Sequence, residues 1–128
     1  MALSEEARTL KQRLSKTVTL RKMQEALKAE WRELAQTEEA VGEELVWQLL
    51  LEGRALKREW AKSSLQNWML MRRVPLNERR GKLLYRRYVK GDSWAQIIQE
   101  TQWSKGYLLR EHNRALEQLA AATALLTA

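Results

Sequence analysis

A single proline, Pro75, divides a chain of 128 residues that is otherwise rich in residues compatible with helices. Proline lacks the backbone N–H that a helix interior needs and restricts the residue before it, so a helix is expected to end at Arg73 or Val74. Glycine occurs only five times, and Leu, Ala, Glu, Lys, Arg and Gln, which lose little freedom in a helix, are abundant. The sequence therefore predicts an all-α protein in two parts, residues 1–74 and 75–128.

The N-terminal part carries two long amphipathic stretches. Over residues 4–36 and 37–73, apolar side chains recur mostly in steps of three or four, the spacing of one helix face. The β-branched run 17–19 interrupts the first stripe, so we expect a bend or a change of packing partner there. Thr37 followed by two acidic residues is typical of a helix start, although a nearby glycine favours a start closer to Glu43. Two long helices with a short link predict an antiparallel hairpin arm.

This arm has more apolar surface than a chain of this size can cover by itself. Four large side chains lie on it, Trp31, Trp47, Trp60 and Trp68. Two helices alone cannot bury both their apolar stripes and these tryptophans. We therefore expect the arm to bind a second copy, so that the protein is a homo-oligomer, most simply a dimer.

The positive charge of the chain is concentrated in one segment. The chain has a formal net charge of +7, and residues 72–114 hold eleven basic against four acidic residues, while the flanking parts nearly balance. A local excess of this size predicts a polyanionic partner, because each neutralised phosphate releases bound counterions. Nucleic acid is the expected partner, ahead of an acidic protein or a membrane surface.

The C-terminal part begins with two predicted helices. The first covers roughly residues 76–90 and ends at Gly91, since glycine adopts the left-handed conformation of a helix stop most easily. Ser93 and Gln96 then form a capping box, which predicts a short helix to about Thr101.

A longer helix is expected after a turn of three or four residues. Ser104 is placed to cap it, and it runs from Lys105 to at least Leu119. A short helix, a tight turn and a longer helix form the pattern of a helix-turn-helix, whose second helix enters the major groove of DNA. Three apolar residues are expected to hold the two helices at a steep angle: Ile97, Trp103 and Leu108.

The first turns of this last helix carry the candidate DNA-binding residues. Lys105 and Arg110 are placed to reach the acceptor edge of guanine, whereas Asn113 and Arg114 lie where phosphate is the expected target. Gly106 costs about 1 kcal/mol of helix stability but lets the backbone approach DNA closely. The complete predicted set is Ser104, Lys105, Gly106, Tyr107, Arg110, Asn113 and Arg114, with Arg86 and Arg87 following the DNA backbone from the preceding helix.

Residues 83–119 resemble region 4 of bacterial sigma factors. The matching pieces are Leu84-Tyr85-Arg86-Arg87-Tyr88, Gly91, Ser93-Trp94, Ser104 and Ala115-Leu116. The segment is still more similar to sigma-like regulators of phages and prophages of Gram-positive bacteria, including RinA/ArpU-type late-gene activators and related domains of unassigned function. Matches to the recognition helix of that group are Arg110, His112, Arg114, Ala115 and Leu116. The resemblance implies promoter or operator binding, and it allows contact with RNA polymerase.

Two residues depart from the sigma-like pattern. Ile98 stands where the pattern prefers a small residue, and overpacking of this kind costs about 1–3 kcal/mol. Glu111 stands where an apolar residue normally faces the core, and a buried carboxylate needs a partner. We therefore expect a changed crossing angle between the two helices. His112, the only histidine, is expected on the helix face near phosphate.

Other classes of protein are less well supported by the sequence. The chain has no cysteine, one histidine and no glycine-rich phosphate loop, so we expect neither an enzyme nor a metal or cofactor site. It shows no signal peptide and no apolar run long enough to span a membrane, and we expect a cytoplasmic protein of a bacterial host cell. Two alternatives remain open: a module that docks on RNA polymerase or another regulator, and a small terminase-like subunit that recognises DNA for phage packaging.

Overall fold

The computed structural model describes residues 2–37 and 42–127, and in this part of the chain it contains helices and no strands. The predicted all-α class is confirmed, with 87% of the described residues in helices. The elements in chain order are α1 (Glu5–Gln36), α2 (Glu43–Arg72), α3 (Glu78–Tyr85), a π-helical turn η1 (Arg86–Lys90), α4 (Trp94–Thr101) and α5 (Lys105–Thr127).

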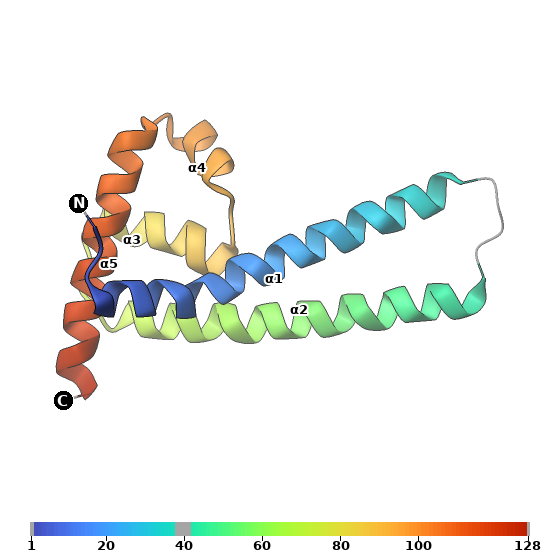
Figure 1. Cartoon of the computed structure of the whole chain (residues 1–128), viewed down its shortest axis with the longest axis horizontal. Coiled ribbons are helices and arrows are strands. Elements are labelled where there is room, and N and C mark those ends of the chain that lie inside the picture. Colours follow the sequence, from blue (N-terminus) through green and yellow to red (C-terminus); the bar gives the residue numbers. More distant parts are fainter. Residues whose placement is uncertain (1, 38–41, 128) are drawn as a thin grey trace.

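Helices α1 and α2 run side by side in opposite directions, and they account for the long axis of the molecule (Figure 1). Thr37 ends α1 instead of starting α2, because its hydroxyl donates to the Leu34 carbonyl at 2.8 Å. The predicted start at Thr37 is therefore wrong. Helix α2 begins at Glu43, the alternative start that the nearby glycine favoured. Residues 38–39, which belonged to the predicted start, lie outside the described residues.

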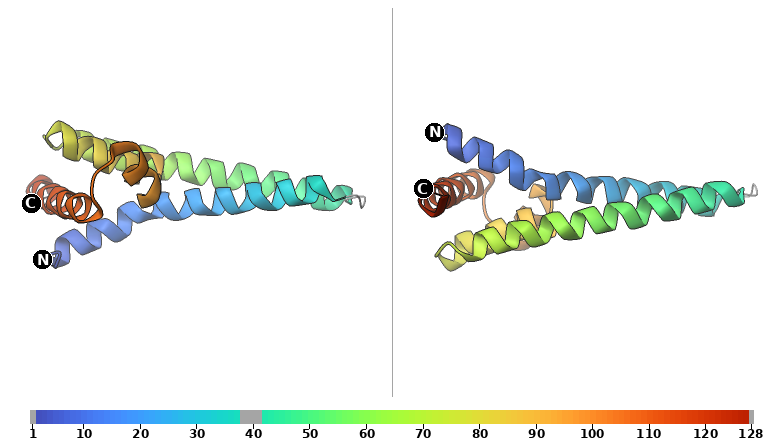
Figure 2. Two further views of the ribbon diagram at one scale, coloured as in Figure 1. Left: turned by 90° about the horizontal axis from the view of Figure 1, so that it is seen from above. Right: turned by 90° about the horizontal axis from the view of Figure 1, so that it is seen from below.

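The main hydrophobic core lies where α5 crosses α1 and α2. Figure 2 shows α5 between the diverging ends of the two long helices, at the end of the molecule that carries both termini. Buried side chains come from both predicted parts of the chain, and they include Ala7, Leu10, Leu14, Val18, Met71, Leu84, Tyr88, Leu116 and Leu119. This core joins the long helices to the C-terminal helices.

A buried polar network continues the core between α1 and α2. The two N–H groups of the Asn67 amide are shared among three acceptors, the Leu14 carbonyl at 3.0 Å, Thr17 Oγ1 at 2.9 Å and the Tyr88 carbonyl at 2.8 Å. Thr17 also bonds the Ser63 hydroxyl at 2.7 Å. In the described part of α1, the buried side chains end at Leu20, directly after the β-branched run.

The segment between Pro75 and α4 differs from the single predicted helix. Asn77 caps α3, accepting from the Arg80 amide at 2.8 Å, and the helix widens into the π-turn before Gly91. Gly91 has φ +84°, and a Cβ there would lie 2.9 Å from the Cβ of Arg21. Both the left-handed conformation and this close approach require glycine.

Candidate nucleic-acid interface

Helices α4 and α5 follow one another in the chain and are joined by three residues, 102–104. The predicted capping box is present at the start of α4: the Gln96 amide donates to Ser93 Oγ at 3.1 Å, and Gln96 Oε1 accepts from the Ser93 amide at 2.9 Å. Gln102 ends α4 in the left-handed conformation. Ser104 Oγ then accepts from the Tyr107 amide at 3.2 Å and caps the first turn of α5.

A small apolar cluster holds this pair together and joins it to α3. Ile97 from α4 and Leu108 from α5 are buried against Leu83 of α3. Trp103 packs against the same cluster, so the three predicted contact residues do meet. Ile98, which departs from the sigma-like pattern, is only partly buried at the edge of the cluster.

The opposite face of α5 is open along its first turns. Lys105, Gly106 and Arg110 are exposed, and a Cβ added to Gly106 would meet no atom within 4 Å. Arg114 is exposed one turn beyond Arg110, and Asn113 is half-buried beside it. In Figure 1 this end of α5 projects away from α1 and α2. The structure therefore brings Gly106, Arg110, Asn113 and Arg114 onto one helix face, whereas Lys105 lies about 140° around the helix from Arg110 and is exposed at its start.

Tyr107 lies at the side of this face, turned toward α3. Its hydroxyl accepts a hydrogen bond from Arg79 Nη1, and its ring packs edge-on against Trp103 with a centroid separation of 5.4 Å. The Arg79 guanidinium lies 5.9 Å from both ring centroids. Tyr107 thus links the start of α5 to α3.

The carboxylate that departs from the sigma-like pattern has a partner. Glu111 has a side chain only 12% exposed, and its Oε2 accepts from Arg80 Nε at 2.9 Å. Arg80 also donates to Gln118 Oε1 at 3.1 Å, so it holds α3 against α5 at two points. The hydrogen bond and positive charge of Arg80 lower the pKa of Glu111. Arg114 lies 3.6 Å from the same carboxylate on the solvent side.

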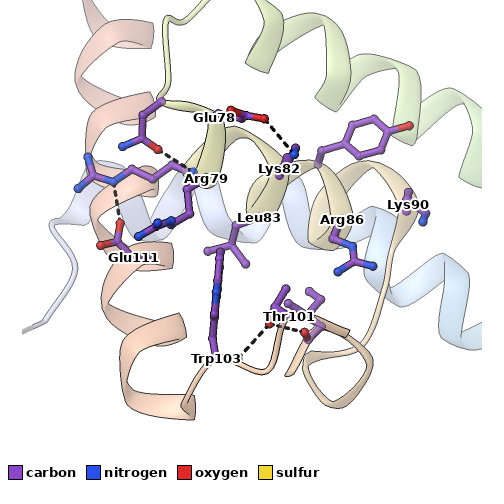
Figure 3. A pocket seen from close by; sticks show the side chains of 13 residues that line it. Glu78, Arg79, Lys82, Leu83, Arg86, Lys90, Thr101, Trp103 and Glu111 are labelled. Atoms are coloured by element: carbon purple, nitrogen blue, oxygen red, sulfur yellow. Dashed lines mark hydrogen bonds and ion pairs between the residues drawn. The ribbon is translucent and has the colours of Figure 1, made fainter. Parts of the chain in front are cut away.

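A groove of about 830 Å³ lies between α3 and the turn that joins α4 to α5 (Figure 3). Five cations line it: Arg79, Arg80, Lys82, Arg86 and Lys90. Two of its lining residues are acidic, Glu78 and Glu111, and each is paired with a cation. Trp103 forms part of the apolar floor, next to Leu83 and Ile97. The groove continues the cationic surface of α5 onto α3.

Arg86 and Arg87, predicted to follow the DNA backbone, are both engaged within the protein. Arg86 pairs with Asp92 at 3.8 Å and with Glu100 of α4, and its side chain is 23% exposed. Arg87 donates to the Asp92 carbonyl at 3.0 Å and lies 4.5 Å from the ring centroid of Trp94. Burial lowers the pKa of Arg87. These contacts position the α3–α4 connection.

His112 lies in the protein interior, so its predicted place near phosphate is wrong. It is 1% exposed, with Nε2 at 2.6 Å from the Tyr88 hydroxyl and the Trp94 ring edge-on at 4.8 Å. Burial lowers its pKa to about 4. The sequence contained the signal for this position, because His112 lies four residues from both Leu108 and Leu116 on the apolar face.

Among the described residues, no cluster of three or more His, Cys, Asp or Glu side chains is arranged to hold a metal ion. The same part of the chain has no helix that is both long enough and apolar enough to cross a bilayer. Comparison with protein-family models, with curated proteins and with solved structures gave no match to this chain.

Proposed function

We propose that this protein is a sequence-specific DNA-binding transcription regulator whose α4 and α5 act as a sigma region 4-like helix-turn-helix. The proposal includes a phage or prophage role, which rests on the sequence resemblance. In it, α1 and α2 form a hairpin arm that carries the DNA-binding end.

The observation that carries this proposal is the open cationic face at the start of α5. Lys105, Gly106 and Arg110 are exposed there, and α4 packs against the other side of the helix. A helix with its side chains is about 10–12 Å across, and the major groove of DNA is about 12 Å wide. The first turns of α5 can therefore enter the groove without a change in the packing of the protein.

Specificity in this arrangement comes from Arg110 and Lys105. Arginine and lysine pair with the O6 and N7 acceptors of guanine, which appear together only in the major groove. Arg114 and Asn113 lie farther from the helix start, where the groove wall offers phosphate oxygens. Because Arg114 already faces Glu111, its contribution to DNA binding is expected to be smaller than that of Arg110.

Phosphate contacts are better assigned to Arg79, Lys82 and Lys90 than to Arg86 and Arg87. Lys82 pairs with exposed Glu78 and Lys90 lies 3.8 Å from Asp92, but the two lysine side chains are still 73% and 51% exposed at the cationic groove. The Arg86 side chain is only 23% exposed, and Arg87 is held by the Asp92 carbonyl. Replacing Lys82 and Lys90 with alanine should weaken binding to all DNA sequences and flatten its salt dependence.

The decisive experiment is selection of bound sequences from random duplexes, followed by titration of the selected site and a scrambled site. Arg110→Ala should weaken binding to the selected site by about 1–3 kcal/mol while leaving the scrambled site nearly unchanged. Arg32→Ala, on the exposed far part of α1, is the matched control and should change neither.

The alternatives left open by the sequence predict different outcomes. Equal loss on both duplexes in the Arg110 variant would contradict a base contact. Strong binding to RNA polymerase with no salt-dependent DNA binding would favour the docking module, and a ring-sized oligomer on DNA would favour the packaging subunit.

A further inference from the structure

The outward face of α2 is uncovered from one end of the helix to the other. Four large apolar side chains lie on it: Trp47 and Leu51 near the start are 55% and 59% exposed, and Leu65 and Met69 near the end are 54% and 45% exposed. Their spacing of four, fourteen and four residues keeps them on one side of a helix with 3.6 residues per turn. In the view from below in Figure 2, no other helix lies over α2. Soluble proteins rarely leave such a stripe without a partner.

The two long helices also have opposite charge at their two ends. The helical turns nearest their connection, residues 25–36 and 43–52, hold six acidic and two basic residues. The part of α2 nearest the C-terminal helices, residues 53–73, holds six basic residues and one acidic residue. Residues 7–24 of α1, beside it, hold six basic and no acidic residues. The arm therefore changes from negative to positive along its length.

We propose that two copies of the chain pair through this outward face, with α2 antiparallel to α2 of the second copy. Antiparallel pairing places the acidic end of each arm against the basic end of the other and covers the apolar residues at both ends. Parallel pairing would place acid against acid and base against base, which is unfavourable. The charge pattern thus favours a second copy of the chain as the partner of α2, and it favours an antiparallel orientation of the two copies. Neither conclusion depends on the proposed DNA binding.

The positions of the apolar residues also predict the register. With Arg58 at the two-fold axis, Leu51 lies opposite Leu65 of the second copy and Trp47 lies opposite Met69. The same register brings exposed Glu44 toward exposed Arg72 of the second copy. The centre of the seam is then cationic, because Arg58 meets Arg58 of the second copy and Arg54 lies opposite Lys62. Charged residues at such positions specify register at a cost in stability.

Disulfide trapping tests the orientation, because the chain has no cysteine of its own. Arg58→Cys should cross-link to itself under mild oxidation, since the two positions meet at the axis. Leu51→Cys and Leu65→Cys should not cross-link singly but should cross-link when the two variants are mixed. Self-cross-linking of all three single variants would establish parallel pairing and overturn the proposal.

Charge reversal tests the pairing without a covalent bond. In sedimentation or light scattering the wild type should be a dimer that weakens with added salt, and Glu44→Arg or Arg72→Glu should each shift it toward the monomer. The double variant should restore the dimer. Glu6→Arg, an exposed reversal on α1 outside the charged segments of the arm, is the control and should leave the dimer intact. A wild-type monomer at every concentration, or no restoration in a double variant whose helix content is native, would overturn the proposal.

Discussion

Replacing Gly106 at the start of α5 tests DNA binding with a single substitution, because the stability of the protein and its affinity for DNA should change in opposite directions. Gly106 is helical with open space around its Cβ position, so Gly106→Ala should raise the free energy of unfolding by about 0.5–1 kcal/mol. The added methyl group would also stand between the backbone and DNA, and affinity for the selected duplex should fall. Thermal unfolding and duplex titration measure the two effects.

Gly81→Ala is the matched control for that experiment. Gly81 is also helical, and a methyl group added there would also have no atom within 4 Å, but this glycine lies on α3. The substitution should give the same gain in stability with no loss of DNA affinity. Equal DNA binding by both variants would argue against close approach of the α5 backbone.

His112 predicts a loss of stability in mild acid. Its pKa is about 4 in the folded protein because burial disfavours the imidazolium, against an ordinary value of 6.5. Above pH 6.5 both the folded and unfolded states are neutral at this residue, so it adds no pH dependence. Between pH 6.5 and 4 the unfolded state takes up the proton first, and the protein should lose roughly 3 kcal/mol of stability.

The measurement is direct because the chain has one histidine. Its imidazole proton signal in NMR should titrate near pH 4 in the folded protein, and chemical denaturation across the same pH range should show the falling stability. A midpoint near 6.5 in the folded state would show that the imidazole is open to solvent.

At the scale of elements, the Arg80–Glu111 pair decides how α3 is held against α5. Arg80→Ala would leave a mostly buried carboxylate without its donor, and it should lower the free energy of unfolding by about 1.5–3 kcal/mol. Glu111→Gln keeps an acceptor for Arg80 and should cost less. Urea denaturation provides the comparison.

Lys82→Ala is the control on the same helix. Lys82 pairs with Glu78 at 3.0 Å, but these side chains are 73% and 82% exposed. An exposed pair is worth at most about 1 kcal/mol. If the Arg80 and Lys82 variants lost the same stability, the pair with Glu111 would not be the contact that anchors α5.

At the scale of the whole molecule, Asn67 joins three elements through one amide nitrogen. It donates to the Leu14 carbonyl of α1, the Thr17 hydroxyl and the Tyr88 carbonyl of η1. Asn67→Ala leaves buried acceptors without a donor, so the loss should exceed about 2 kcal/mol. The exposed neighbour Gln66→Ala should be nearly neutral in the same denaturation series. If Asn67→Ala and Gln66→Ala lowered the free energy of unfolding equally, water would be taking over the hydrogen bonds of the Asn67 amide.

Much of the local structure follows from short-range chemistry that the sequence displays. Pro75, Gly91, the Ser93–Gln96 box and Ser104 are at the predicted boundaries, because capping and left-handed stops involve residues within a few positions of one another. The spacing of Ile97 and Leu108 likewise predicted the cluster that holds α4 and α5. The predicted homo-oligomer, the DNA contacts and the two-part domain division remain predictions.

Residues whose partners lie far away in the chain were beyond local reasoning. Arg80 and Glu111 are 31 positions apart. The burial of His112 could be read from the spacing of its helix, but its partner Tyr88 is 24 positions away. Arg86 and Arg87 resemble free surface cations until the fold brings Asp92, Glu100 and Trp94 beside them. The sequence alone determined the helical class, several helix ends and the cationic character of the C-terminal part, because these depend on neighbouring residues. Only the tertiary structure decided which cations are neutralised inside the protein and which face solvent, because that choice depends on packing between distant helices.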